Sequence, residues 1–143
     1  MKILCIEDYE EKYTHIETVL SDITSNIVWR KSYQEGLSEL KANTYDILLL
    51  DMSMPICEFE SNTDNFDNYA GMTIMREIKR KRYKIKVIII TGFSDFEKGS
   101  GTITLNELEQ EIKEKYSDIF LECIKYDSTS VEWQERLIKL LKE

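Results

Sequence analysis

The residues of this sequence best suited to chemistry are three acids that follow two short apolar runs. Glu7 and Asp8 follow residues 2–6, and Asp51 follows the run at 47–50. Parallel strands leave their carboxyl ends at one edge of a sheet, so these carboxylates are expected to lie together there. Crowded carboxylates repel one another unless a cation lies among them, and oxygen ligands of this kind suit Mg²⁺. Because an Asp carboxylate is also a nucleophile toward phosphorus, the pattern predicts Mg²⁺-dependent phosphoryl transfer to Asp51.

Two further apolar runs end in residues that would complete such a site. Thr91 closes the run at 86–91, and Lys125 follows the run at 119–124. The threonine hydroxyl is a short donor that can reach a phosphoryl oxygen, and the lysine supplies positive charge. We therefore expect three carboxylates, a hydroxyl and an ammonium group to converge at one edge of the sheet.

The elements that position these residues follow from the hydrophobic pattern, in which short apolar runs alternate with stretches of helical spacing. The expected strands are 2–6, 27–29, 47–50, 86–91 and 119–124, and the expected helices are 10–20, 32–41, 72–81, 104–116 and 129–141. S/T-x-x-E motifs at 104–107 and 129–132 predict capping boxes for the last two helices. This alternation predicts an α/β fold: a flavodoxin-like, doubly wound, five-stranded parallel sheet of order 2-1-3-4-5 with helices on both faces.

Composition limits the class of protein. A length of 143 residues with 42% hydrophobic residues predicts one domain spanning 1–143, and a net charge of −8 disfavours nucleic acid as a partner. The longest apolar runs are strand-sized, so no membrane span is expected, and the first residues lead into a strand instead of a signal peptide. The three cysteines form no metal-binding pattern and suit a reducing environment, so we expect a cytoplasmic protein.

Taken together, these residues resemble a response-regulator receiver domain of two-component signalling, similar to a stand-alone chemotaxis receiver, over essentially the whole chain. The acids after the first and third strands, Thr91 and Lys125 match the family's pattern, as do residues 52–55 and Gly71 around the phosphoacceptor loop. The resemblance implies that Asp51 accepts a phosphoryl group from a histidine kinase or a phosphotransfer protein.

The same resemblance implies roles for the other site residues. Glu7, Asp8 and Asp51, with the main-chain carbonyl of Ser53, would hold Mg²⁺, Thr91 would bind the phosphoryl group and Lys125 would pair with it. Such a protein is not an enzyme in the ordinary sense, because it catalyses only its own phosphorylation and dephosphorylation. Phosphorylation would switch a surface that binds a downstream protein, whose identity the sequence does not give, and dimerisation is left open.

The chain departs from the family's pattern at two positions in the fifth strand and its loop. Tyr126 stands where the family usually has a proline, often after a cis bond, so we expect a trans or reshaped loop. Glu122 stands where an aromatic switch residue is expected, so any coupling to Thr91 would use Phe120 or Phe93, or would be absent.

Two long loops, at 56–70 and 94–103, are atypical insertions at the expected site edge. Loops of this length in a small domain usually serve a function, and we interpret these as covering the site or binding a partner. The departures leave open an alternative: a receiver-like interaction module that needs no phosphate. A phosphatase with an Asp nucleophile is disfavoured, because Ser53 stands where its second acid would be. His15, the only histidine, is interpreted as an ordinary, partly exposed side chain.

Overall fold

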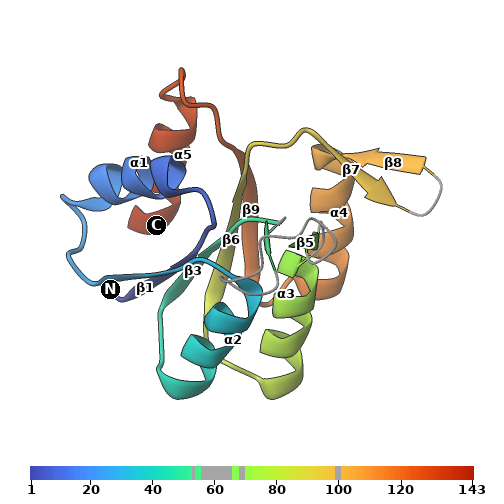
Figure 1. Ribbon diagram of the computed structural model, residues 1–143, viewed down its shortest axis with the longest axis horizontal. Coiled ribbons are helices and arrows are strands. Elements are labelled where there is room, and N and C mark those ends of the chain that lie inside the picture. Colours follow the sequence, from blue (N-terminus) through green and yellow to red (C-terminus); the bar gives the residue numbers. More distant parts are fainter. Residues whose placement is uncertain (53, 56–65, 68–69, 99–100) are drawn as a thin grey trace.

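A computed structural model describes residues 1–52, 54–55, 66–67, 70–98 and 101–143 (Figure 1). Its helices are α1 (Glu10–Leu20), α2 (Tyr33–Ala42), α3 (Ala70–Lys81), α4 (Leu105–Tyr116) and α5 (Glu132–Lys142). Its strands are β1 (Ile3–Ile6), β2 (Ile27–Arg30), β3 (Ile47–Leu50), β4 (Met54–Pro55), β5 (Phe66–Asp67), β6 (Lys86–Thr91), β7 (Asp95–Lys98), β8 (Gly101–Thr104) and β9 (Phe120–Lys125). Strands and helices alternate as the hydrophobic pattern predicts. The extra strands are short: β4 and β5 precede α3, and β7 and β8 follow β6.

The main sheet has five parallel strands in the order β2-β1-β3-β6-β9. Counted along the five expected strands, this is the predicted order 2-1-3-4-5, which is therefore confirmed. The central strand β3 pairs with β1 on one side and with β6 on the other. The chain adds β2 on one side of β1 and the later strands on the other side, so the switch point of the sheet lies between β1 and β3. The carboxyl ends of these two strands carry the three candidate acids.

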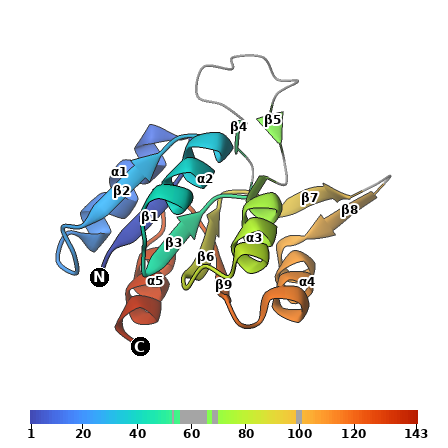
Figure 2. The same cartoon turned by 90° about the horizontal axis from the view of Figure 1, so that it is seen from below.

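Helices cover both faces of the sheet, α1 and α5 one face and α2, α3 and α4 the other (Figures 1 and 2). Alternate residues of each strand enter different cores: Leu48 and Leu50 of β3 lie on the side of α2–α4, whereas Leu49 lies on the side of α1 and α5. All three leucines are almost completely buried. The continuous apolar runs in the sequence therefore reflect strands that are buried on both faces.

The helix starts confirm one predicted cap and correct the other. Thr104 caps α4 through a complete capping box with Glu107, as the sequence predicts. The box predicted at 129–132 is wrong, because α5 begins at Glu132 and the amide of Glu132 instead bonds to the hydroxyl of Ser130 at 3.1 Å. Asp127 accepts from both the amide and the hydroxyl of Thr129, which holds that residue in a turn before the helix.

The two predicted loops differ from expectation where the structure describes them. β7 and β8 form an antiparallel hairpin, so residues 94–103 are not a plain loop, and the hairpin projects beyond α4 (Figure 1). β4 pairs with β5 at the insertion expected at 56–70, and α3 begins at Ala70. The remainder of the loop expected at 56–70, residues 56–65 and 68–69, lies outside the described residues.

Candidate functional site

The predicted acids meet at the carboxyl edge of the sheet. Glu7 and Asp8 follow β1, Asp51 follows β3, and one carboxylate oxygen from each lies within 4.8 Å of the others. Asp51 and Glu7 are 6% and 2% exposed, whereas Asp8 faces solvent. The set is therefore a half-sheltered cluster of hard oxygen donors, which fits a divalent cation such as Mg²⁺.

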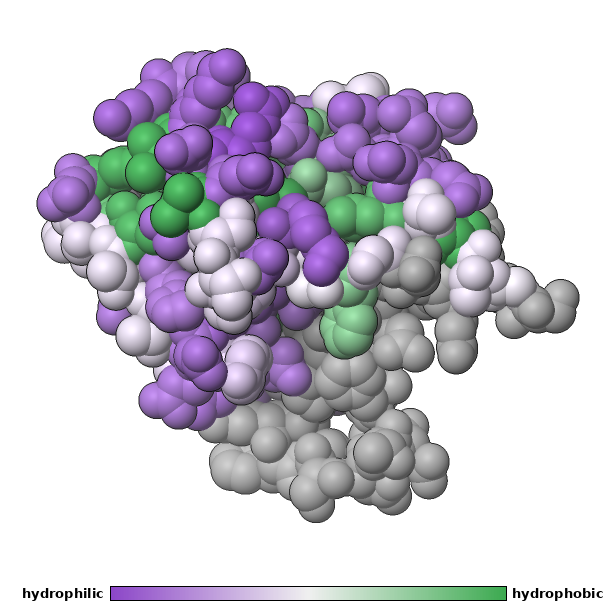
Figure 3. All heavy atoms as spheres, turned by 90° about the horizontal axis from the view of Figure 1, so that it is seen from above, coloured by the Kyte–Doolittle hydropathy of each residue, from purple (hydrophilic) through white to green (hydrophobic). Residues whose placement is uncertain are grey.

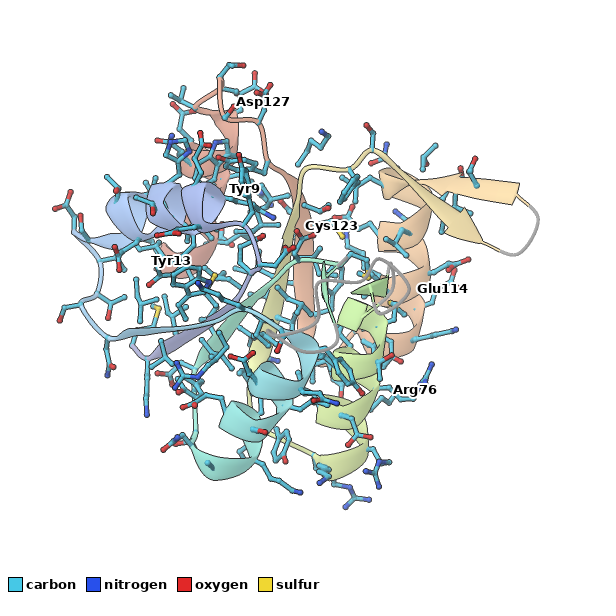
Figure 4. All side chains as sticks on the ribbon, in the orientation of Figure 1. Tyr9, Tyr13, Arg76, Glu114, Cys123 and Asp127 are labelled. Carbon is cyan, nitrogen blue, oxygen red and sulfur yellow. The ribbon has the colours of Figure 1, made fainter. Side chains whose placement is uncertain are left out.

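Main-chain and aromatic contacts fix the position of Glu7. Its carboxylate accepts a hydrogen bond from the amide of Tyr9 at 3.1 Å, and its main-chain oxygen accepts one from the Trp29 indole at 2.7 Å. The Trp29 ring stacks on Tyr13 of α1, with ring centroids 4.3 Å apart. Figure 4 labels Tyr13 on this helix. The Trp29 indole thus fixes the main chain of Glu7, and the Tyr9 amide orients its carboxylate.

A lysine from α1, absent from the predicted site, lies among the acids. Lys12 is 3% exposed, and its Nζ lies 2.6 Å from Oε1 of Glu7 and 3.1 Å from Oδ2 of Asp51. The same ammonium group donates to the main-chain oxygen of Ile90 at 2.6 Å. Its three donors are thus directed at the ends of β1, β3 and β6.

The sequence does contain a signal for this lysine. Lys12, Ile16 and Leu20 recur at intervals of four, and all three are buried against the sheet. The helical spacing is carried by the apolar members of this stripe, and a lysine near a helix start is usually solvated. The helix directly follows two acids at a strand end, and a lysine on its inward face is therefore a candidate partner for those acids.

Burial dominates the electrostatics of the cluster. Desolvation raises the pKa of Glu7 to about 8; Lys12 opposes this shift and the charge of Asp51 adds to it. Desolvation and the charge of Asp51 also raise the pKa of Asp8. For Lys12, the two carboxylates outweigh its burial and raise its pKa, so its ammonium group stays charged.

These shifts predict how stability depends on pH. Glu7 binds a proton more tightly in the folded protein than in the unfolded chain, since its pKa rises from 4.5 to about 8. Its contribution to the free energy of unfolding is therefore present at low pH and is lost as pH rises through about 8. In metal-free buffer we expect Glu7→Gln to remove most of this fall, which is on the order of a few kcal/mol. Denaturant unfolding between pH 5 and 9 measures it; the exposed Glu10→Gln is the control, and an unchanged slope in Glu7→Gln would contradict the assignment.

Thr91 and Lys125 also reach this edge, as expected from the ends of β6 and β9. The two residues are partners in the strand register. Thr91 is completely buried, and its hydroxyl accepts from the amide of Phe93 at 3.3 Å. The ammonium group of Lys125 donates to the main-chain oxygen of Gly92 at 2.6 Å. In the described part of the chain Lys12 forms an ion pair with Asp51, and the role predicted for Lys125 toward a phosphoryl group stays a prediction.

Tyr126 reshapes the loop that follows Lys125. The bond between these residues is trans, and the amide of Tyr126 donates to the main-chain oxygen of Thr91 at 2.8 Å. The Tyr126 ring packs on Trp133 at 5.1 Å, and its hydroxyl lies 2.7 Å from Nδ1 of the partly exposed His15. The expectation of a trans loop is confirmed, and the tyrosine uses an amide donor that proline lacks.

At the position expected for an aromatic switch, Glu122 forms an ion pair with Arg136 of α5. Of the two residues considered as substitutes, Phe120 is buried and Phe93 is 50% exposed. Phe93, two residues after Thr91 in the chain, is thus the more exposed of the two. Ser53, predicted to supply a metal ligand, lies outside the described residues.

Comparison with known proteins decides the family. The family model described as the response regulator receiver domain matches residues 3–106. The chain belongs to the response-regulator receiver family. The match includes Glu7, Asp8, Asp51 and Thr91, while β9 with Lys125 and the helix α5 lie beyond it. Within this family the protein has the role of a phosphoacceptor in signalling.

Two relatives match almost the full length of this receiver domain. The Detocs response regulatory protein DtcB of Enterobacter cloacae is 28% identical, over 100% of this chain and 99% of its own. The uncharacterized protein y4jR of Sinorhizobium fredii is 26% identical, over 94% of this chain and 92% of its own. The cell cycle response regulator CtrA of Brucella ovis matches over 68% of this chain and 37% of its own length.

Solved structures confirm the receiver fold. The response regulator TrrA of Thermotoga maritima, in complex with Mg²⁺ and BeF, has a TM-score of 0.63 at 20% identity, covering 98% of this chain and 99% of its own. Chemotaxis protein CheY4 of Vibrio cholerae has a TM-score of 0.64 at 16% identity, covering 99% and 95%. In the described part of the chain, no helix is both long enough and apolar enough to cross a membrane.

Proposed function

We propose that Asp51 receives a phosphoryl group from a histidine kinase or a phosphotransfer protein and thereby switches a protein-binding surface. The observation that carries the proposal is the convergence of Asp51 with Glu7 and Asp8, whose carboxylate oxygens lie within 4.8 Å of one another. The domain would act only on itself, catalysing its own phosphorylation and dephosphorylation in the cytoplasm. The fold supports the proposal, because the ends of neighbouring parallel strands bring the Asp51 nucleophile close to the acids that would hold a cation.

The reaction needs few groups from the protein. An oxygen of the Asp51 carboxylate forms a bond to phosphorus, and the phosphorus–nitrogen bond of a phosphohistidine donor breaks. The electron pair stays on the imidazole nitrogen, which takes a proton from water. Thr91 would donate its hydroxyl to the phosphoryl group after moving, and Lys125 would leave Gly92 to pair with it; both lie at the correct edge.

The acid cluster fits Mg²⁺ by its chemistry, since carboxylate oxygens are the ligands this ion prefers. Glu7, Asp8 and Asp51 would hold it, with the predicted help of the Ser53 carbonyl. When bound, the ion supplies positive charge that neutralises the phosphoryl oxygens. Its positive charge would also lower the pKa values of Glu7 and Asp8, which desolvation and, to a lesser extent, the charge of Asp51 raise.

The surface around the site suits a protein partner. Three exposed large apolar residues, Tyr9, Phe93 and Val131, lie in the loops after β1, β6 and β9, at 57%, 50% and 60% exposure. The view from this side shows apolar groups among the hydrophilic side chains (Figure 3). Apolar side chains within a polar rim favour protein contacts over nucleic acid, in keeping with the net charge of −8.

A second candidate is an interaction module that needs no phosphate, and one observation favours it. Lys12 already supplies a positive charge to Glu7 and Asp51, at 2.6 and 3.1 Å. An acid cluster that carries its own cation could be stable without metal or phosphate. The intact nucleophile, Thr91 and Lys125 support the first function, which is therefore the one proposed.

Labelling with acetyl phosphate separates these functions. We expect the wild-type protein to gain one phosphoryl group by intact mass in Mg²⁺ buffer, and to gain none in EDTA. Asp51→Asn keeps the side-chain shape but has no nucleophilic carboxylate, so we expect it to gain none in either buffer. Failure of the wild-type protein to gain the group in Mg²⁺ would overturn the proposed function and favour the interaction module.

A further inference from the structure

The contacts of Lys12 set it apart from the other lysines of the described chain. Its side chain is almost completely buried, and its ammonium group contacts Glu7, Asp51 and the main-chain oxygen of Ile90 at 2.6, 3.1 and 2.6 Å. An ammonium group has three donors, so these contacts use all of them. Two of the three acceptors are carboxylates of the candidate metal site.

We propose that Lys12 is an intramolecular counter-ion that competes with a divalent cation for Glu7 and Asp51 and so lowers the affinity of the site for Mg²⁺. The inference rests on the proposed function, because it assumes the metal site. It goes further by giving this chain its own means of controlling when the metal binds.

Competition follows from shared ligands and from charge. A cation that uses Oε1 of Glu7 or Oδ2 of Asp51 must displace the Lys12 ammonium group from that oxygen. A cation that uses the other carboxylate oxygens must remain close to a buried positive charge. In either case the lysine opposes metal binding, since like charges interact strongly where water is excluded.

The surroundings give Lys12 partners that do not depend on the carboxylates. The main-chain oxygen of Ile90, which is not a candidate metal ligand, accepts a hydrogen bond from Lys12 at 2.6 Å. The ring centroid of Tyr126 lies 5.6 Å from Nζ, within the range of a cation–π contact. The ammonium group could thus give up its carboxylates while keeping a carbonyl and an aromatic ring. Tyr126, the residue in place of the family's usual proline, supplies that ring.

Titration with MgCl₂ by isothermal calorimetry tests the inference. Lys12→Met removes the charge and keeps much of the apolar stem. We therefore expect its affinity for Mg²⁺ to be at least about tenfold higher than that of the wild-type protein. The control is Lys113→Met, which removes the charge of an exposed lysine that pairs with the partly buried Glu109 on α4. We expect its affinity to equal that of the wild-type protein. Titrations at pH 7.5 and about pH 9 distinguish two effects on Mg²⁺ affinity: the loss of the lysine charge, and the protonation of the carboxylates.

An affinity in Lys12→Met that is unchanged or weaker than wild type at both pH values would overturn the inference. Should that variant not fold, the wild-type protein itself provides the test. The ¹⁵N ammonium signal of Lys12, identified by its loss in Lys12→Arg, is expected to shift as Mg²⁺ is added, and a signal that stays fixed at saturating metal would overturn the inference. Neither result depends on phosphoryl uptake, so failure here differs from failure of the labelling experiment.

Discussion

Replacing Tyr126 with proline, the residue usual for the family, is expected to lower the free energy of unfolding by about 3–5 kcal/mol. Proline has no amide hydrogen, so the hydrogen bond to the main-chain oxygen of Thr91 at 2.8 Å would be lost. The substitution would also remove a ring that is 9% exposed and packs edge-on against Trp133. A change toward the family pattern would therefore be destabilising here, because the neighbouring residues are fitted to tyrosine.

Denaturant unfolding of Tyr126→Pro beside Tyr126→Phe measures this effect. Phenylalanine keeps the amide and the ring but loses the contact between the hydroxyl and His15, so we expect it to cost about 1 kcal/mol. A proline variant as stable as the phenylalanine variant would show that neither the amide bond nor the ring packing contributes as described.

The parallel sheet with helices on both faces could be predicted because its strands are apolar on both faces, and its strand order was taken from the flavodoxin-like fold. The runs at 47–50 and 86–91 contain few charged residues, which is the pattern of strands covered by helices on both sides. The meeting of Glu7, Asp8 and Asp51 then followed from the rule that parallel strands end at one edge. These inferences needed the chain direction, the pattern of burial and the strand order of that fold.

Side-chain pairing could not be predicted in the same way. A lysine such as Lys12 is expected to be solvated, and only the three-dimensional position of Glu7 and Asp51 makes its burial favourable. The hairpin of β7 and β8 was missed for a similar reason, since four-residue strands rich in polar residues and glycine resemble a loop. Both features depend on contacts formed after the chain has folded, rather than on local spacing.

Lys12→Met is expected to destabilise the metal-free protein by about 3–5 kcal/mol at about pH 9. Removing one partner of a buried ion pair leaves the other charge without compensation. Glu7 is 2% exposed and would keep only the hydrogen bond from the Tyr9 amide to offset its burial and the repulsive charge of Asp51. In Lys113→Met the lost pair is partly exposed and its charges are 3.7 Å apart, so its loss is expected to change stability by no more than about 0.5 kcal/mol.

The cost of Lys12→Met should also depend on pH and on metal, which distinguishes a lost charge from a packing defect. Burial already raises the pKa of Glu7 to about 8, so at pH 6 this carboxyl would be protonated and would need no partner. We therefore expect a clearly smaller cost at pH 6 than at pH 9. At high pH, saturating Mg²⁺ should reduce the difference in free energy of unfolding between Lys12→Met and the wild-type protein. A cation that binds only the folded variant stabilises it by mass action. Chemical denaturation at both pH values, with Mg²⁺ and with EDTA, measures all four cases. An equal cost in every case would mean that Lys12 contributes by filling space, and its charge would then have no part in the stability of the acid cluster.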